Sequence, residues 1–307
     1  MKTRSSTLKL ILAFAAVYII WGSTYLGIRI AIESIPPFLM AGTRFVIAGS
    51  ILYIIARIKS NEKLTLIHWR SGLIIGGLLL LGGNGGVVWA EQFVPSGLTA
   101  LLVSTVPIWI IIMNWMLPNG EKITLKTVIG VFLGFIGLFL LVNPHDLTKS
   151  GGVDLIGAGV LLFATFTWAI GSIYSNHAVL PKSKIMTVAI EMISGGILLL
   201  IFSFITGDVS KFSIEEVSTR SVLSLIYLII FGSIIAFTAY MWLLGAAGPS
   251  KATTYAYVNP VVALLLGWFF VDEIITMEIV IAMVIILSAV ALINTDLSYL
   301  RSKIKRQ

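Results

Sequence analysis

Cysteine is absent from the 307 residues, only three histidines are present, and only 11% of the residues are charged. The lack of cysteine excludes a disulfide framework, a thiolate zinc site, an iron–sulfur cluster and a cysteine nucleophile. The histidines do not pair at metal-ligand spacing, and the sequence has no serine nucleophile elbow and no nucleotide-binding glycine motif. These absences predict a protein without a cofactor, a metal site or enzymatic activity.

Hydrophobic side chains dominate the composition, at 58% of the residues, and the mean hydropathy is +1.01. A soluble domain is about 25% charged and a disordered chain has low hydrophobicity, so both classes are excluded. A transmembrane helix needs about 20 apolar residues, and the sequence contains ten such runs. They cover 9–31, 36–58, 69–91, 96–117, 124–142, 153–178, 184–206, 220–245, 250–271 and 276–295. The predicted fold class is therefore an all-α membrane protein with ten transmembrane helices, and the first run is too long for a signal peptide.

The basic residues give a net charge of +7 and fall mostly between the apolar runs. If both termini are cytoplasmic, sixteen of them lie on the inner side and four on the outer side. The inner ones are Lys2, Arg4, Lys9, Arg57, Lys59, Lys63, Arg70, Lys122, Lys126, Lys182, Lys184, Lys251, Arg301, Lys303, Lys305 and Arg306, and the outer ones are Arg29, Lys149, Lys211 and Arg220. This asymmetry predicts a multi-pass protein of the cell inner (plasma) membrane, with the 144–152 and 207–219 loops outside. A nucleic-acid partner is not needed to explain the positive charge.

The two halves of the chain repeat a pattern of prolines. Pro95 and Pro107 are 12 residues apart in the fourth run, and Pro249 and Pro260 are 11 residues apart in the ninth. Each half would contain five runs, and an odd number turns the second copy upside down relative to the first. The pattern predicts an inverted repeat, which is a common plan of secondary transporters. The alternative is a duplicated structural bundle that transports nothing.

Several short motifs occur in an order and spacing that are typical of one transporter family. They are Tyr18–Tyr25, Met40–Phe45, Gly83–Gly85, Val94–Gly97 with Thr105–Pro107, Ala189–Met192, Phe231–Ala236 and Ser250–Pro260. On these motifs the chain resembles the ten-span, EamA-type branch of the drug/metabolite transporter superfamily, and within it the YedA-like exporters. The resemblance covers nearly the whole chain and implies two EamA-type repeats, at 1–148 and 149–307.

The resemblance and the inverted repeat together predict a secondary transporter. It would export small amphipathic metabolites or drugs across the inner membrane by alternating access, driven by the proton gradient or by the substrate gradient itself. Its partners would be a small-molecule substrate and the lipid bilayer. Two alternatives stay open: an uptake carrier of the same fold for amino acids or related metabolites, and a membrane enzyme or scaffold without transport.

Two charged residues, Arg44 and Glu191, lie deep inside predicted spans. A charge at the bilayer centre costs at least about 2.5–3.5 kcal/mol, so it usually faces the bundle and has a partner. Arg44 precedes Gly49 by five residues and Glu191 precedes Gly196 by five, which puts both at equivalent repeat positions. We therefore predict that the two form an ion pair, which either only holds the halves together or also contacts substrate or a coupling proton.

One asparagine and two prolines are further candidates for the transport machinery. Asn84 lies between glycine pairs that let a ligand approach closely, with a hydrogen bond at a helix crossing as the alternative. Pro107 and Pro260 deprive a carbonyl one turn earlier of its donor, so we predict that both are hinges in kinked helices that line a cavity. Asn259 is placed to supply one hydrogen bond there.

Aromatic residues gather on the spans that the resemblance places around the cavity. They are Trp21, Tyr25, Trp168, Tyr174, Tyr240, Tyr255 and Tyr257. The first six, with Arg44, Glu191, Asn84 and Asn259, form the predicted set of substrate-binding or coupling residues. For any single ring the alternative is packing or lipid contact.

Gly130, Gly134 and Gly137 form a ridge of small residues in the fifth span. The ridge is suited to pairing two subunits or to packing against the tenth span, and we favour the tenth span. The oligomeric state stays open.

Overall fold

The computed structural model describes residues 2–94, 99, 102–117, 124–141, 155–271 and 277–294, and all regular structure within these ranges is helical. The elements are α1 (Lys2–Ala31), α2 (Pro37–Lys59), α3 (Leu66–Gly76), η1 (Gly77–Gly85), α4 (Gly86–Ala90), α6 (Val106–Met116), α7 (Leu125–Leu141), α9 (Leu155–His177), α10 (Lys184–Ile205), η2 (Val209–Lys211), η3 (Ile214–Glu216), α11 (Thr219–Tyr227), η4 (Leu228–Phe237), α12 (Thr238–Ala247), α13 (Pro249–Ala252), α14 (Tyr255–Val271) and α15 (Met277–Asn294). The predicted all-α class is confirmed. Pro95, the 144–152 loop and the C-terminal residues lie outside the described ranges.

Six continuous helices in the described ranges are long and apolar enough to cross a membrane. They are Thr7–Ala31, Pro37–Lys59, Leu66–Ala90, Leu155–His177, Lys184–Ile205 and Thr219–Ala247. Each coincides with one of the predicted spans to within a few residues. The other four predicted spans overlap shorter helices, α6, α7, α14 and α15, and α6 covers only the second half of its span. These helices fit a multi-pass membrane protein.

Two of the long helices contain a π-helical segment. The first is η1, which continues α3 and leads into α4, and the second is η4, which connects α11 to α12. A π turn is wider than an α turn, and such turns are frequent at functional sites. Both segments border the cavity described below.

Turns interrupt the predicted fourth and ninth spans, and they do so ahead of the prolines. The chain turns at Ser104–Thr105 before α6, and again at Thr253–Thr254 between α13 and α14. Threonine hydroxyls in both turns donate to carbonyls of the preceding turn, which competes with regular helix bonds. Pro107 is therefore the second residue of α6, where a missing N–H costs nothing, while Pro260 lies inside α14. The fourth span is thus interrupted just ahead of Pro107, and the role of Pro107 as a hinge stays a prediction.

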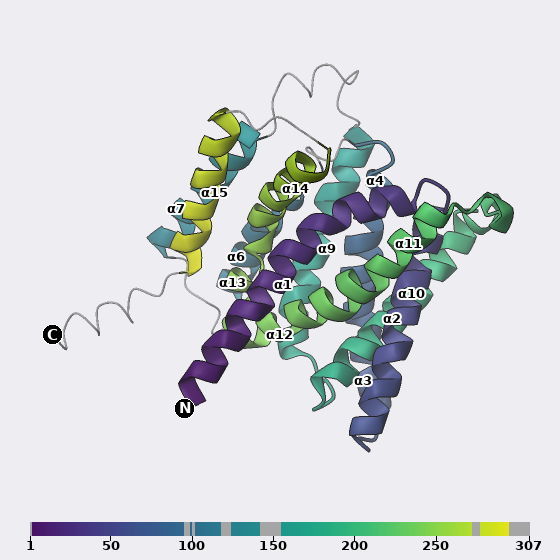
Figure 1. Cartoon of the computed structure of the whole chain (residues 1–307). Helices are drawn as coiled ribbons and strands as arrows, with labels where there is room; N and C mark the ends of the chain where they lie inside the picture. The colour runs from purple at the N-terminus through teal and green to yellow at the C-terminus, as the bar shows by residue number, and fades with distance from the viewer. Residues whose placement is uncertain are drawn as a thin grey trace.

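Helices α2 and α10 form the most closely packed pair in the bundle. A Cβ added at Gly49 would lie 2.8 Å from the backbone nitrogen of Ile193, and one added at Gly196 would lie 2.7 Å from that of Val46. Small residues on both helices thus let the two backbones approach closely, as is usual in membrane helices. The second close pair is α7 with α15, which lie side by side along one edge of the bundle (Figure 1). Gly130 and Gly137 of the glycine ridge pack against α15, as predicted, whereas Gly134 packs against Tyr257 of α14.

Candidate functional site

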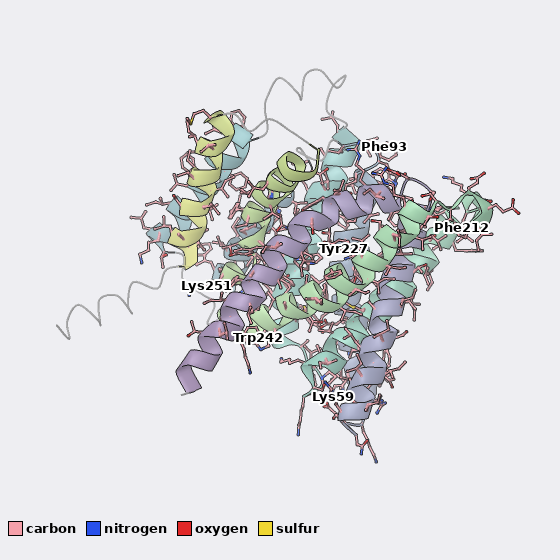
Figure 2. The ribbon with its side chains drawn as sticks, in the orientation of Figure 1. Lys59, Phe93, Phe212, Tyr227, Trp242 and Lys251 are labelled. Carbon is pink, nitrogen blue, oxygen red and sulfur yellow. The ribbon has the colours of Figure 1, made fainter. Side chains whose placement is uncertain are left out.

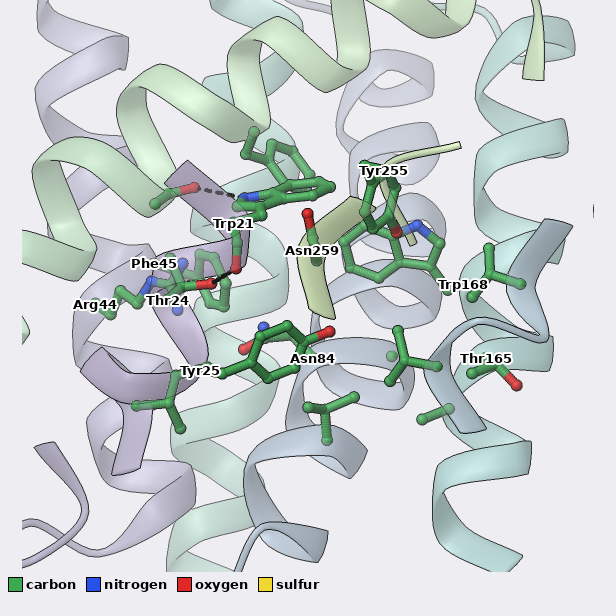
Figure 3. Close-up of a pocket in the computed structure, with 18 residues that line it drawn as sticks. Trp21, Thr24, Tyr25, Arg44, Phe45, Asn84, Thr165, Trp168, Tyr255 and Asn259 are labelled. Carbon is green, nitrogen blue, oxygen red and sulfur yellow. Dashed lines mark hydrogen bonds between the residues drawn. The ribbon is translucent and has the colours of Figure 1, made fainter. Parts of the chain in front are cut away.

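A cavity of about 80 Å³ lies between helices from both halves of the chain (Figure 3). By the same measure one water needs about 10–15 Å³, so the cavity has room for several waters or for a small solute group. Its walls come from α1, α2, η1, α4, α6, α9, η4 and α14, together with Val103. The lining is largely apolar and aromatic with a few polar groups, which is typical of ligand-binding sites.

The structure brings most of the predicted site residues to this cavity. The lining includes Trp21, Tyr25, Arg44, Asn84, Trp168, Tyr255 and Asn259. Tyr240 is completely buried behind the lining, where it contacts three of these aromatic rings. Tyr174 and Glu191 lie elsewhere: Tyr174 packs, partly buried, against the main hydrophobic core, and Glu191 is buried in α10.

Four aromatic rings from four different helices form a cluster at one end of the cavity. Trp21 of α1, Trp168 of α9, Tyr240 of α12 and Tyr255 of α14 pack with centroids 4.7–5.6 Å apart, mostly in edge-to-face or tilted geometry. Such pairs contribute about 0.5–1.5 kcal/mol each beyond the burial of their area. We call these four residues the aromatic cluster.

Hydrogen bonds fix the polar atoms of the aromatic cluster. The Trp21 indole donates to the carbonyl of Gly232 in η4 at 3.1 Å, so it uses a backbone acceptor of the π-helical segment. The Trp168 indole donates to the Tyr240 hydroxyl at 3.0 Å, and that hydroxyl lies 2.6 Å from the hydroxyl of Ser172. Trp21, Trp168 and Tyr240 are thus each held by packing and by a specific polar contact, while Tyr255 is held by its ring contacts.

Arg44 projects from α2 toward η4 at the wall of the cavity and is only 3% exposed. Its Nε donates to the hydroxyl of Ser233 in η4 at 2.7 Å, whereas its Nη1 has no hydrogen-bond partner. A Cβ added at Gly232 would lie 2.7 Å from Nη2, so the guanidinium occupies space that only glycine leaves free. Its Cζ lies 4.8 Å from the ring centroid of Phe45.

The predicted ion pair between Arg44 and Glu191 does not form. Glu191 is fully buried, and neither of its carboxylate oxygens has a hydrogen-bond partner. Helix α2 faces α10 through Gly42 and Val46, and Arg44 lies two residues from each, about 200° around the helix. Arg44 therefore points away from α10, although the two helices are close neighbours as the prediction required.

Glu191 lies where α10 packs against a different helix, α3. Its backbone carbonyl would lie 2.5 Å from a Cβ at Gly76, and Gly195, one turn further along α10, packs against the same glycine. This face of α10 therefore meets α3 and not the cavity. The reason for the wrong pairing is that equivalent repeat positions fix depth but not the direction in which a side chain points.

Two asparagines contribute amide groups to the cavity wall. Asn84 lies in η1, and its Oδ1 has no hydrogen-bond partner. When the Asn259 amide is turned so that its nitrogen faces these acceptors, that nitrogen donates to the carbonyls of Tyr255 at 3.1 Å and Tyr18 at 3.2 Å. Asn259 thus links α14 to α1, but its bond within α14 goes to the carbonyl of Tyr255 and not, as predicted, to the carbonyl that Pro260 leaves without a donor.

Sequence reasoning missed several polar residues of the site. Ser233 and Thr24 lie in two of the family motifs but were not recognised as site residues, and Thr165 lines the cavity without any sequence signal. The Thr165 hydroxyl accepts a bond from Thr105 at 3.0 Å, which joins α9 to the turn before α6. Glu91 lies one turn beyond the cavity residue Val87, and its buried carboxylate oxygens have no hydrogen-bond partner. The sequence could have indicated Glu91 only through its helical spacing, four residues after Val87.

Comparison with known proteins finds relatives over most of the chain. Residues 8–143 and 155–295 each match the EamA-like transporter family. The chain is 41% identical over 256 residues to the uncharacterized inner membrane transporter YedA of Escherichia coli strain K12, covering 83% of this chain and 80% of YedA. It is 30% identical over 280 residues to the uncharacterized transporter YoaV of Bacillus subtilis strain 168, covering 91% and 94% of the two chains.

A solved crystal structure shares the fold, with a TM-score of 0.72 and 18% identity, covering 94% of this chain and 96% of the other. The long apolar helices and the cavity between them define a multi-pass helical membrane protein. The chain belongs to the EamA-like transporter family, which confirms the resemblance drawn from its motifs.

Proposed function

We propose that this chain is a secondary transporter, not an enzyme, that exports small amphipathic metabolites or drugs across the inner membrane by alternating access. The observation that carries the proposal is the cavity whose walls come from both halves, with the aromatic cluster at one end. A site between two halves that rock against each other is what alternating access requires.

The pairing of helices supports an inverted repeat of ten spans, with repeats at 1–148 and 149–307. Helix α1 packs against α14 and the α11–η4–α12 helix, and its counterpart α9 packs against α6 and the η1–α4 segment. The counterparts α2 and α10 pack on each other, as do α7 and α15. Exchange of partners between the halves is expected for a twofold axis in the membrane plane. The two family matches, at 8–143 and 155–295, divide the chain at the same place.

The orientation follows from the charges. Lys59 lies at the end of the bundle opposite Phe93 and Phe212 (Figure 2), as cytoplasmic termini and an outer 207–219 loop require. In this orientation the aromatic cluster lies on the cytoplasmic side of the cavity, because Trp21 precedes Tyr25 along the outward-running α1. The four rings would therefore separate the bound substrate from the cytoplasm in this conformation.

Glu191 is the candidate for a coupling proton. It is buried without a hydrogen-bond partner, and a carboxyl group is the side chain that takes up and releases protons in transporters. The energy source is then the proton gradient, with the substrate's own gradient as the second option.

The test is transport by the purified chain in liposomes, with solutes chosen from an efflux screen of overexpressing cells. Comparison of inside-out with right-side-out membrane vesicles gives the direction. Trp168→Ala in the aromatic cluster should reduce transport, while Trp115→Ala, whose ring is 62% exposed on α6, is the matched control. Transport that runs only inward contradicts export, and the absence of transport for every solute that the screen yields contradicts the whole proposal.

A further inference from the structure

The cavity contains a cationic group that faces no acidic side chain among the described lining residues. Among the described residues that line it, Arg44 is the only charged one, and its Nε donates to the neutral hydroxyl of Ser233. A guanidinium keeps its proton in proteins, so burial cannot remove this charge. Resting on the proposed function, we propose that the substrate carries a carboxylate, which binds the free side of the Arg44 guanidinium.

The guanidinium is held in place, and one of its terminal nitrogens is buried without a partner. Ser233 fixes Nε at 2.7 Å, Gly232 makes room for Nη2, and Nη1 has no hydrogen-bond partner. A buried charge normally requires a partner, and the pairing of guanidinium with carboxylate is strong and directional. The substrate therefore supplies the missing anion, and a cationic solute would meet a like charge.

The rest of the lining indicates what the carboxylate is attached to. Trp21, Trp168 and Tyr255 present aromatic surface to the cavity, which suits an apolar or aromatic body. The unpaired Oδ1 of Asn84 accepts a hydrogen bond from a donor on the solute. The substrate class is accordingly a small organic carboxylate with a flat or apolar body, in which Arg44 selects charge and the aromatic cluster selects shape.

The test is binding, measured as thermal stabilisation of the purified full chain in detergent. The probes are acetate, benzoate and indole-3-acetate, each compared with its neutral amide, and sodium chloride at the same ionic strength. A ligand that binds only the folded state raises the melting temperature with its concentration. We expect at least one aromatic carboxylate to stabilise the protein more than its amide and more than chloride.

Three variants assign this effect to the guanidinium. Arg44→Gln should weaken the apparent affinity for that carboxylate about ten- to hundredfold. Gly232→Ala should weaken it through displacement of Nη2, and Arg44→Lys should weaken it because an ammonium lacks the guanidinium fork. Arg57→Gln, on the same helix but hydrogen-bonded at the exposed end, is the matched control and should leave binding unchanged. If Arg44→Gln does not fold, Arg44→Lys and Gly232→Ala complete the test.

Three outcomes would overturn the proposal: equal stabilisation by acid and amide for every probe, an effect of chloride as large as that of the carboxylates, or carboxylate binding that Arg44→Lys and Gly232→Ala leave intact. Because this assay measures no transport, it fails independently of the proposed function. Export of a neutral solute that survives Arg44→Gln would support the proposed transport and contradict the proposal that the substrate carries a carboxylate.

Discussion

The carboxylate of Asp208 accepts a hydrogen bond from the backbone N–H of Phe38 at 3.0 Å, so a residue that follows α10 caps the start of α2. Glu62, which follows α2, accepts hydrogen bonds from the backbone N–H groups of Lys182 and Ser183 at 2.8 and 3.1 Å, just before α10. Each acid lies three residues beyond the end of its helix. The two contacts are reciprocal and tie the packed α2–α10 pair together at both ends.

Removal of the Asp208 carboxylate should weaken this pair. Asp208→Ala leaves the Phe38 N–H, one of the unpaired donors of a helix start, without its acceptor. We expect a loss of about 0.5–2 kcal/mol, as for other helix caps, and a lower melting temperature in detergent. Asp208→Asn keeps an acceptor oxygen and should retain most of the stability. A melting temperature for Asp208→Ala equal to that of the wild type would contradict the proposal that Asp208 stabilises the start of α2.

The Glu62 contact predicts a dependence of stability on pH. The hydrogen bonds from the backbone N–H groups of Lys182 and Ser183 hold the pKa of Glu62 below its usual range. A lowered folded-state pKa gives stability that is present above the unfolded value of about 4.3 and is lost as the pH falls through the folded value. The difference in melting temperature between wild type and Glu62→Gln should therefore shrink as the pH falls from about 6 to below 4. The exposed Glu216→Gln is the control, and a difference that grows on acidification contradicts the assignment.

The close approach of α2 and α10 predicts intolerance of a single methyl group. Gly49→Ala places a Cβ 2.8 Å from the backbone nitrogen of Ile193, which cannot move aside as a flexible side chain would. Overpacking of this kind costs about 1–3 kcal/mol. Gly159→Ala in α9 meets nothing within 4 Å and should be neutral or stabilising, because alanine is the better helix former. The yield of monodisperse protein and its melting temperature provide the readout; equal values for both variants would mean that the backbones are not in contact.

The two prolines predicted as hinges should now differ from each other. Pro260 lies inside α14, so Pro260→Ala restores a helix bond and should impair transport more than membrane abundance. Pro107 lies in the first turn of α6, where Pro107→Ala restores no bond, and it serves as the matched control. Normal efflux by Pro260→Ala at normal abundance would contradict the prediction that Pro260 is a hinge.

The absence of cysteine makes the orientation directly measurable, because any engineered cysteine is the only one in the chain. A cysteine at Lys211 should react with an impermeant maleimide in intact cells, and a cysteine at Gln307 should react only after the cells are opened. Labelling of Gln307→Cys in intact cells would reverse the topology.

The sequence predicted the membrane class and the positions of the spans because these depend on local composition. A run of about 20 apolar residues has the same meaning whatever surrounds it, so Thr7–Ala31 and Lys184–Ile205 occur close to where the sequence placed them. The motifs likewise identified the family, and they included most of the residues that line the cavity. Local turn chemistry was harder to predict: the threonine turn at Thr253–Thr254 lies ahead of the proline on which the prediction relied.

What only the tertiary structure decided is which side chains meet. Arg44 and Glu191 are at matched positions on neighbouring helices, yet the glycine-lined contact of α2 with α10 turns Arg44 toward Ser233 and leaves the Glu191 carboxylate buried without a partner. Which face of a helix becomes the contact is set by packing against all its neighbours at once, and a helix rotated by two residues presents its opposite side. The sequence by itself therefore determined that these charges are buried in the membrane, while the packing of the whole bundle left the guanidinium of Arg44 without a counter-charge at the cavity.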